Sequence, residues 1–223
     1  MFEQLIQIDR SWLLAINGAH APWADALFWQ ISRPETWIPL YVVLLIALSI
    51  RLRGQRSTIL GWSVPSIVPA VVMIAIAVGC SDLVCAQVIK PLVARLRPTH
   101  DEAILSLVHV VNGYRGGAYG FCSNHAANTM ACAVLCTALF AHGRSWQTHL
   151  YVTLPLVLWV VMNCYSRMYL GVHYPLDILA GILVGGVIAW LVWLSAKHCL
   201  FPIEEHVHRD AEGSFASVRT AQE

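Results

Sequence analysis

The sequence predicts an all-α membrane protein: a polytopic bundle of about five transmembrane helices, or six, with interfacial helices at its N-terminus. Of the 223 residues, 57% are hydrophobic and 12% are charged, whereas charged residues make up about 25% of an ordinary soluble domain. The apolar residues also gather in runs, and a helix needs about 20 such residues to cross a bilayer core. The net charge of +1 gives no indication of a nucleic-acid partner.

Residues 1–33 contain two short amphipathic stretches, with Trp12, Trp23 and Trp29 among polar residues. Tryptophan favours the interface between lipid and water, so we predict one or two helices that lie on the membrane. The alternative is that this segment adds the sixth span. No secretory signal peptide is expected, because Asp9 interrupts the hydrophobic region that such a peptide needs.

Five apolar runs follow, and they are 37–50, 57–89, 128–141, 151–164 and 176–194. The run 57–89 is too long for one perpendicular span, so we expect its helix to tilt or to project from the bilayer. Residues 34–199 would form the transmembrane core of a single domain, 1–199. Residues 200–223 are polar and offer little surface to bury, which predicts a disordered cytoplasmic tail.

The basic residues between the runs predict the orientation of the bundle. The segments 51–56 and 142–144, together with Lys197, fall on one face in a five-span count, so the positive-inside rule makes that face cytoplasmic. The opposite face receives the segments 91–124 and 165–175, which are equally basic. These outward cations oppose the rule unless they have a specific task, and the task that we infer is to bind an anion.

Lys90 and Arg97 belong to the first of three polar clusters on the predicted outward face, KPLVARLRP at 90–98. Seven residues are two turns of an α-helix, so both side chains would lie on one helix face, about 10 Å apart along the axis. Both could then reach one anion. Alternatively, they extend to lipid head groups at the membrane surface.

The second cluster is GFCSNHAANT at 120–129, where Ser123 and Asn124 precede a predicted helix. Such residues cap a helix N-terminus, and the free N–H groups and positive dipole end of that terminus bind anions. His125 would lie in the first turn and point into the site. The alternative is a simple helix cap with a histidine at the membrane interface.

The third cluster, NCYSRMYLGVHYPLD at 163–177, carries Arg167, His173 and Asp177 between two apolar runs. His173 and Asp177 are four residues apart and are neighbours if the helix has already begun there. A carboxylate bonded to one imidazole nitrogen fixes the tautomer and leaves the other nitrogen basic. An unpaired carboxylate at a membrane helix end is costly, so Asp177 requires such a partner. The planar guanidinium of Arg167 suits a phosphate.

These residues predict phosphoryl transfer without a metal ion. The sequence has no cluster of Asp and Glu suited to Mg²⁺ and no His and Cys set with zinc spacing, so we expect no metal and no cofactor. Its seven cysteines lie mostly in apolar runs, where we expect them to pack. The cations would neutralise phosphate oxygens, His173 would attack phosphorus, and His125 would protonate the leaving oxygen. Water activated by His125 would then hydrolyse the phosphohistidine.

The three segments KPLVARLRP, SNH and SRMYLGVHYPLD resemble the signature of the type 2 phosphatidic acid phosphatase superfamily. That signature is Lys, six residues and Arg-Pro; then Ser-Gly-His; then Ser-Arg, five residues, His, three residues and Asp. The sequence departs from it at Asn124, where the family usually has Gly or another small residue, but the backbone N–H survives this change.

This resemblance implies an all-helical bundle with its site at the extracytoplasmic, or periplasmic, surface of the cytoplasmic (inner) membrane. It also implies that His173 is the nucleophile, that Asp177 orients it, and that His125 is the acid and base. The residues that it implies for phosphate binding are Lys90, Arg97, Ser123, Asn124 and Arg167.

Three further residues are candidate contacts to a lipid head group: Arg95 in the first cluster, and His100 and Arg115 in the loop that follows it. Arg95 is two residues from Arg97 and would therefore lie on another face of the helix, where we expect it to contact lipid. The glycines in 112–120 predict a tight loop over the site. Gly181 and Gly185 form a small-residue pair, which predicts close helix packing.

We therefore predict a lipid phosphatase that removes a terminal phosphate from a membrane lipid. Candidate substrates are undecaprenyl diphosphate, phosphatidylglycerol phosphate or phosphatidate, and lipid A; the partners are this lipid and the bilayer, and the oligomeric state stays open. A lipid acceptor in place of water would make the chain a phosphotransferase with the same phosphohistidine. A non-enzymatic transporter would place its ionisable residues in mid-span, whereas here they gather at helix ends on one face.

Overall fold

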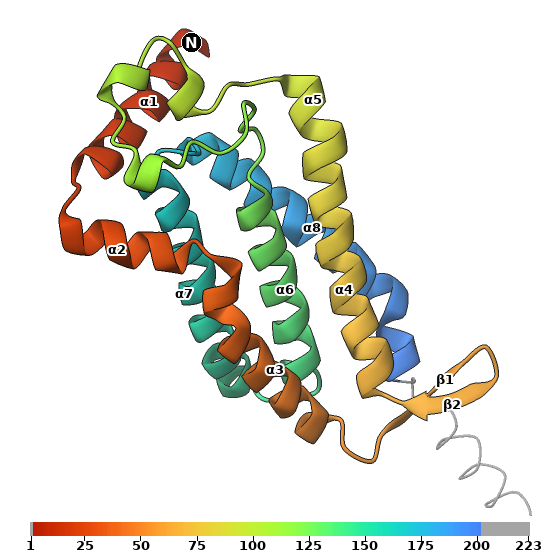
Figure 1. Ribbon diagram of the computed structural model, residues 1–223. Coiled ribbons are helices and arrows are strands. Elements are labelled where there is room, and N and C mark those ends of the chain that lie inside the picture. The colour runs from red at the N-terminus through yellow and green to blue at the C-terminus, as the bar shows by residue number, and fades with distance from the viewer. Residues whose placement is uncertain (1, 202–223) are drawn as a thin grey trace, which may run out of the picture.

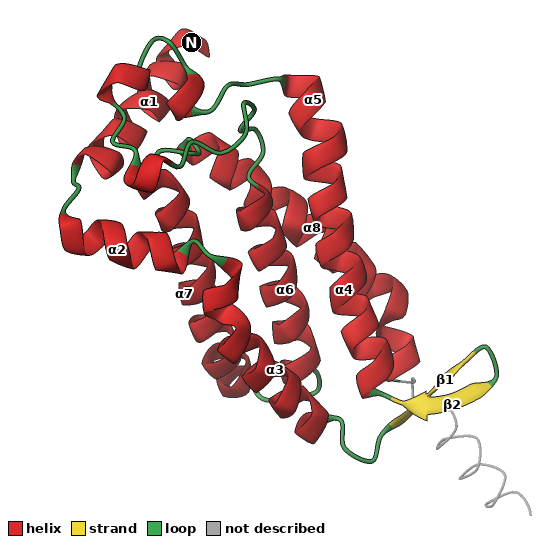
Figure 2. Ribbon diagram, in the orientation of Figure 1, coloured by secondary structure: helices red, strands yellow, loops and turns green. Residues whose placement is uncertain are grey.

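Helices make up most of the structure, a computed structural model that describes residues 2–201 (Figures 1 and 2), and the predicted all-α fold is confirmed. The α-helices are α1 (Phe2–Gly18), α2 (Pro22–Ile31), α3 (Ile38–Arg51), α4 (Ile67–Leu83), α5 (Lys90–Val93), α6 (Asn124–Ala141), α7 (Trp146–Tyr169) and α8 (Pro175–Leu200). The other elements are the strands β1 (Arg56–Ile59) and β2 (Trp62–Pro65), the π-helical turn η2 (Val84–Ile89), and the 3₁₀ turns η1 (Pro34–Trp37), η3 (Pro98–His100), η4 (Leu105–Leu107) and η5 (Val111–Gly113). Of the predicted tail, 202–223 lies outside the described residues, and Leu200 still belongs to α8.

Four helical segments are long and apolar enough to cross a membrane: Pro34–Arg51, Ile67–Val93, Trp146–Tyr169 and Pro175–Leu200. The remaining predicted span, 128–141, corresponds to α6, which packs against α3, α4, α7 and α8. Its first two turns carry the polar residues Asn124, His125 and Asn128. Because neighbouring helices cover α6, it needs less apolar surface than a helix that faces lipid. The bundle therefore consists of four outer spans around a central helix.

We expected the long apolar run 57–89 to form one tilted or projecting helix, and this expectation was wrong. Its first part is an antiparallel hairpin of β1 and β2, which turns at Gly61 with φ of +81°. A positive φ of this kind favours glycine, which has no Cβ. The span begins only after the hairpin and runs as one helical segment of 27 residues, Ile67–Val93, through α4, η2 and α5.

The basic segments that we placed on one face lie together at one end of the bundle. A guanidinium N–H of Arg51 donates to the carbonyl oxygen of His142 at 3.2 Å, and the ring of His142 packs on Phe201, directly after α8. The hairpin lies at this end, whereas α1, α5 and the loop 94–123 lie at the other (Figure 1). The five-helix arrangement thus separates the basic connections from the polar clusters. Which end faces the cytoplasm stays a prediction.

The N-terminal helices α1 and α2 cover the end of the bundle that carries the long loop (Figure 1). Neither is among the membrane-spanning candidates within residues 2–201, so the sixth span is not found there. Leu13 of α1 is fully buried against Tyr174, and the side-chain amide of Asn17 donates to the carbonyl oxygen of Tyr169 at 2.7 Å. Trp12 remains 63% exposed, as suits an interfacial helix. One side of α1 therefore packs against the bundle, and the other side is exposed.

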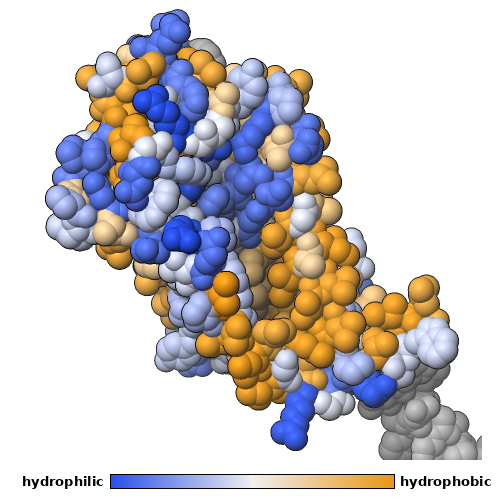
Figure 3. Space-filling view, viewed as in Figure 1, coloured by the Kyte–Doolittle hydropathy of each residue, from blue (hydrophilic) through white to orange (hydrophobic). Residues whose placement is uncertain are grey.

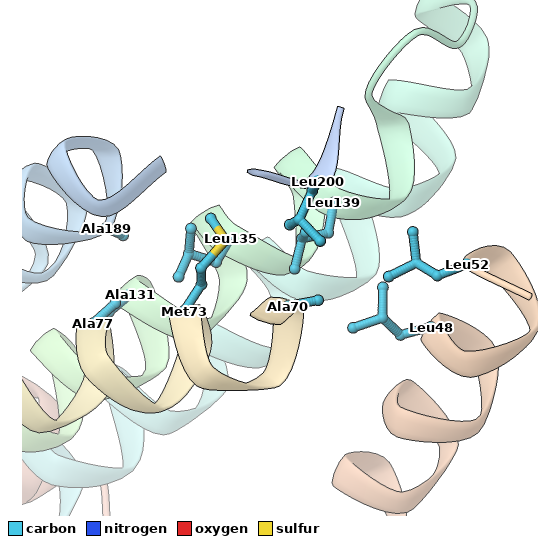
Figure 4. Packing of buried hydrophobic residues seen from close by; sticks show 10 residues of the cluster. All are labelled: Leu48, Leu52, Ala70, Met73, Ala77, Ala131, Leu135, Leu139, Ala189 and Leu200. Atoms are coloured by element: carbon cyan, nitrogen blue, oxygen red, sulfur yellow. The ribbon is translucent and has the colours of Figure 1, made fainter. Parts of the chain in front are cut away.

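A buried apolar cluster holds α3, α4, α6 and α8 together (Figure 4). Close contact between α6 and α8 depends on small residues: a Cβ at Gly185 would lie 2.1 Å from the carbonyl oxygen of Ala127, and one at Gly181 would lie 2.5 Å from that of Ser123. The helix packing predicted for this glycine pair is thereby confirmed. Its consequence is that the first turns of α6 and α8 meet, and the N–H of Ser123 donates to the carbonyl oxygen of Asp177 at 2.9 Å.

Candidate active site

The segment that carries Lys90 and Arg97 is not one continuous helix, and this part of our prediction was wrong. α5 ends at Val93, and Ala94 turns the chain with a left-handed backbone, φ +48°. After this turn the backbone N–H of Arg97 donates to the carbonyl oxygen of Ala118 at 2.9 Å. The two cations nevertheless lie close enough to repel each other. They meet because the chain turns back on itself, and not because they share a helix face.

Two guanidinium groups of this site have buried N–H groups that no residue within 2–201 accepts: Nη1 of Arg97 and Nε of Arg167. The Nε–H of Arg97 donates to the carbonyl oxygen of Tyr119 at 3.1 Å, and Arg167 donates to the hydroxyls of Ser32 and of Tyr114, the latter at 3.1 Å. A buried polar group without a partner costs about 1–3 kcal/mol. A phosphate, with several acceptor oxygens and negative charge, would satisfy both groups.

Two glycines allow the loop before α6 to approach these groups. Gly116 has φ of +68°, and a Cβ there would lie 2.4 Å from Nη1 of Arg97. A Cβ at Gly120 would lie 2.9 Å from Oδ2 of Asp177. Since real side chains do not fit at these distances, the glycines are required for the backbone to cover the site. The tight loop predicted from its glycines is confirmed.

His173 lies between α7 and α8, beside Asp177 in the first turn of α8. Its Nδ1 is 3.5 Å from Oδ2 of Asp177, and the same oxygen accepts the N–H of Tyr174 at 3.0 Å. The first distance is long for a hydrogen bond, but catalytic contacts of this kind shorten when a substrate binds. Nδ1 has no nearer partner in the described part of the chain, and both side chains are fully buried. The predicted pairing of these two residues is therefore present as a close contact.

The pKa of His173 is held well below its usual value, first by burial and then by the positive charges of Arg97 and Arg167. A neutral imidazole keeps a lone pair on one nitrogen, which is the form that can attack phosphorus. The same surroundings thus provide cations for a phosphate and an unprotonated histidine beside them.

Arg95 occupies a position that we did not predict. Its Nη1 donates to Oδ1 of Asp177 at 2.9 Å, its Nη2 donates to Oδ2 of Asp9 at 2.5 Å, and its guanidinium stacks on the ring of Tyr174 at 3.9 Å. The other oxygen of Asp9 accepts the N–H of Leu176 at 2.9 Å. Arg95 is thus bound to two buried carboxylates. Our expectation that it contacts lipid was wrong. Through Arg95, α1 is connected to the carboxylate beside His173.

His125 lines a cavity of about 230 Å³ together with Ser32, Tyr114 and Arg167. The positive charge of Arg167 acts on it, and His173 is also near enough to influence it, so the two histidines and this arginine share one site. The cavity is the open part of the site, where a leaving group could lie beside His125.

Ser123 caps α6, as predicted, because its hydroxyl oxygen accepts an N–H of the first turn at 3.5 Å. The side chain of Asn124 forms a bridge between two other segments. Its oxygen accepts a hydrogen bond from the ammonium of Lys90, and its NH₂ group donates to Oδ1 of Asp82 at 2.7 Å. The residue that departs from the family signature therefore positions Lys90 with its side chain.

His100 and Arg115 remain within the loop, where both bond Thr99: Nδ1 of His100 lies 3.1 Å from its hydroxyl, and Arg115 donates to its carbonyl oxygen at 3.4 Å. Their contact with a head group stays a prediction.

Three residues of this site were missed in the sequence: Asp9, Ser32 and Tyr114. Asp9 carried a signal, because it is a single carboxylate four residues before Leu13, on the face of α1 that is buried. Ser32 and Tyr114 lie in polar connecting segments, where nothing in the local sequence marks them.

The arrangement brings together all eight residues to which we assigned catalysis or phosphate binding, although their roles stay predictions. Residues 2–201 contain no group of three His, Cys, Asp or Glu side chains that could hold a metal ion. What the site offers instead is positive charge, unpaired N–H donors and two histidines, a set suited to phosphoryl transfer.

Known proteins resemble the chain in both sequence and fold. It is 38% identical over 197 residues to a lipid A 4′-phosphatase of Bacteroides thetaiotaomicron, covering 88% of this chain and 80% of that protein. It is 30% identical over 195 residues to a lipid A 4′-phosphatase of Porphyromonas gingivalis, covering 86% and 74%.

Among solved structures, a transmembrane PAP2-type phosphatidylglycerolphosphate phosphatase from Bacillus subtilis shares the fold with a TM-score of 0.64, 16% identity and 90% of each chain covered. Aquifex aeolicus LpxE matches with a TM-score of 0.53 and 21% identity, covering 82% of this chain and 93% of that one. The family model described as the PAP2 superfamily matches residues 66–199, which contain the three polar clusters. The chain belongs to the PAP2 superfamily.

Proposed function

We propose that this multi-pass membrane phosphatase hydrolyses lipid A at a terminal phosphate, through a phosphohistidine and without a metal ion. The observation that carries the mechanism is the pair of buried guanidinium groups, each with an N–H that has no acceptor among residues 2–201, beside the buried His173 and Asp177. The choice of lipid A is supported by the two relatives named lipid A 4′-phosphatases, which align with 88% and 86% of the chain.

In the first step, a lone pair of His173 forms a bond to phosphorus while the bond from phosphorus to the lipid oxygen breaks. Asp177 would hold the proton-bearing Nδ1, so that the other nitrogen faces phosphorus. Arg97, Arg167 and Lys90 would neutralise the charge on the phosphate oxygens. His125, protonated, gives its proton to the leaving oxygen of the lipid.

In the second step, His125 is neutral and accepts a proton from water. The oxygen of that water forms a bond to phosphorus, the bond to His173 breaks, and inorganic phosphate leaves. The first reaction therefore prepares His125 for the second, and the enzyme returns to its starting state.

We also propose that the site faces the periplasm from the inner membrane. The support is the separation of the basic connections near Arg51 and His142 from the phosphate site at the opposite end of the bundle. Cysteine labelling of loop positions in intact cells tests this orientation.

The decisive experiment is phosphate release by the purified protein from a panel of lipid A, undecaprenyl diphosphate, phosphatidate and phosphatidylglycerol phosphate. We expect lipid A to be cleaved fastest, EDTA to have no effect, and His173→Ala to abolish release. With ³²P-labelled lipid, label should appear on the wild-type protein and be absent from His173→Ala, and His125→Ala should slow phosphate release, because His125 acts in both steps.

Each part of the proposal fails on a separate result. Inhibition by EDTA contradicts the metal-free mechanism, and activity of His173→Ala contradicts the nucleophile. Label that appears in an acceptor lipid instead of inorganic phosphate makes the chain a phosphotransferase.

A further inference from the structure

A second and larger cavity lies between α3 and α4, with α6 as its floor. Its volume is about 480 Å³, and its lining is mainly hydrophobic, with Leu44, Val71, Ile74 and Cys136 among the residues. Figure 3 shows a recess between the hydrophobic surfaces of these helices, next to the hydrophilic end of the molecule. Because α3 and α4 belong to membrane-spanning candidates, the recess lies at the depth of the hydrocarbon. An acyl chain of a lipid substrate is the occupant that suits this position.

The end of this cavity toward the catalytic site is polar. It is lined there by Asn128 and Thr129 of α6, one helical turn beyond Asn124 and His125. The hydroxyl of Thr129 donates to the carbonyl oxygen of His125 at 2.8 Å and is therefore satisfied within the helix. The cavity thus leads along α6 to the proposed acid and base.

Asp82 of α4 fixes the orientation of two side-chain amides at this point. Its Oδ1 accepts hydrogen bonds from the NH₂ groups of Asn124, at 2.7 Å, and of Asn128, at 3.0 Å. A carboxylate only accepts, so both amides turn their nitrogen toward it and their oxygen away. The oxygen of Asn124 is occupied by the ammonium of Lys90.

The oxygen of Asn128 is different: it is buried, and none of residues 2–201 donates a hydrogen bond to it. A buried acceptor without a donor is costly. The amide cannot exchange its oxygen and nitrogen by rotating, because Asp82 accepts the hydrogen bond from the nitrogen. The missing group is a donor, and because Asn128 lines the polar end of the cavity, a donor on a molecule bound there is the group that would pair with this oxygen.

We propose that the amide oxygen of Asn128 selects lipid phosphates that carry an N–H or O–H group beside the chain that fills the cavity. The inference rests on the proposed lipid phosphatase function. N-acyl and hydroxyacyl chains supply such a donor, whereas phosphatidate, with two ester-linked chains, and polyprenyl phosphates do not. A site built to bond a donor discriminates against a lipid that lacks it, because the acceptor is then left unpaired.

A pair of lipids that differ in this donor tests the proposal. Ceramide 1-phosphate has an amide N–H and a hydroxyl, phosphatidate has neither, and both are phosphomonoesters with two chains. We would measure the ratio of kcat/KM for the two in mixed micelles, with lipid A as a reference. In Asn128→Leu this ratio should fall by about 3- to 10-fold, the value of one hydrogen bond.

Two further variants separate recognition from a change of shape. Asp82→Asn releases the amide of Asn128, so the ratio should fall here too, and this variant serves if Asn128→Leu does not fold. Thr129→Val is the matched control, because its hydroxyl lines the same cavity but is already bonded within α6. It should leave the ratio as in the wild type.

An unchanged ratio in Asn128→Leu, or an equal fall in Thr129→Val, would overturn the inference while the phosphatase function stands. Release from none of the lipids by the wild type would overturn the proposed function itself. If lipid A alone is cleaved, the comparison of Asn128→Leu with Thr129→Val on lipid A decides: equal kcat/KM refutes the inference, and a selective loss in Asn128→Leu supports it.

Discussion

Replacing Arg95 with methionine tests whether α1 helps to hold the proposed nucleophile in place. Methionine keeps an unbranched aliphatic stem but removes the bonds to Asp177, at 2.9 Å, and to Asp9, at 2.5 Å. Asp177 then retains the N–H of Tyr174 as its nearest donor. We expect its carboxylate to lose its fixed position, and with it the orientation of His173. Because the phosphate-binding cations are untouched, kcat should fall more than KM changes.

The size of this effect follows from the burial of the two partners. A hydrogen bond to a charged group contributes about 1.5–3 kcal/mol, and breaking a buried ion pair costs about 3–5 kcal/mol. The side chain of Asp177 is fully buried but that of Arg95 is 23% exposed, so water screens part of the interaction and the lower range applies. A loss of about 2 kcal/mol in the positioning of His173 corresponds to a fall of about 10- to 100-fold in kcat.

The assay is phosphate release by purified protein, with thermal unfolding measured in parallel. Arg10→Met is the matched control: Arg10 also joins α1 to the long loop, through Asp101 at 2.8 Å, and its side chain is 25% exposed, close to the 23% of Arg95. Both variants should lose stability, but only Arg95→Met should lose kcat to the extent stated. Equal losses of kcat in the two variants, or full kcat in Arg95→Met, would refute the positioning role and leave Arg95 as a structural link.

Four further predictions address other parts of the site and the fold. The acidic limb of the kcat/KM profile should lie below pH 6.5, because burial and two arginines lower the pKa of His173; a limb above that pH would contradict the assignment. Since the folded state favours the neutral imidazole, this group should also reduce the stability of the fold as the pH falls below 6.5, which thermal unfolding at several pH values can measure. Gly116→Ala places a methyl group 2.4 Å from Nη1 of Arg97 on a positive-φ backbone, so KM should rise about tenfold, and an unchanged KM would argue against the phosphate contact. Gly185→Ala should destabilise the protein by about 1–3 kcal/mol through overpacking. Gly186→Ala is the control and should not destabilise it, because a Cβ there meets its first neighbouring atom at 3.8 Å. Equal melting temperatures of the two variants would refute this reasoning.

The sequence predicted the helical class and the arrangement within single polar clusters because both depend on local properties. Apolar runs of spanning length identify membrane helices, and the spacing of His173 and Asp177 makes them neighbours across the start of α8. The cap at Ser123 likewise depends on residues within one turn. These features need no knowledge of distant segments.

Two of the three incorrect expectations concern the chain on either side of α4; the third is the lipid contact of Arg95, which instead bonds Asp177 and Asp9. Alanine favours helices, so nothing local marks Ala94 as the left-handed residue that ends α5. Tertiary contacts decide it, since Leu96 pairs with Tyr119 of the later loop. Hydropathy also did not separate the β1–β2 hairpin from the span, because Ile59, Leu60, Trp62 and Val64 extend the apolar run.

By itself, the sequence determined which chemical groups the site contains, since residue types and short spacings are local. The tertiary structure alone decided how those groups are held: Asp9 bonds Leu176, 167 positions away, and Arg95 reaches Asp177 across 82 positions. It also decided that the side-chain oxygen of Asn128, which lines a mainly apolar cavity, has no hydrogen-bond donor within residues 2–201. Such contacts depend on how helices distant in the chain pack together, and packing on that scale leaves no pattern within a single segment.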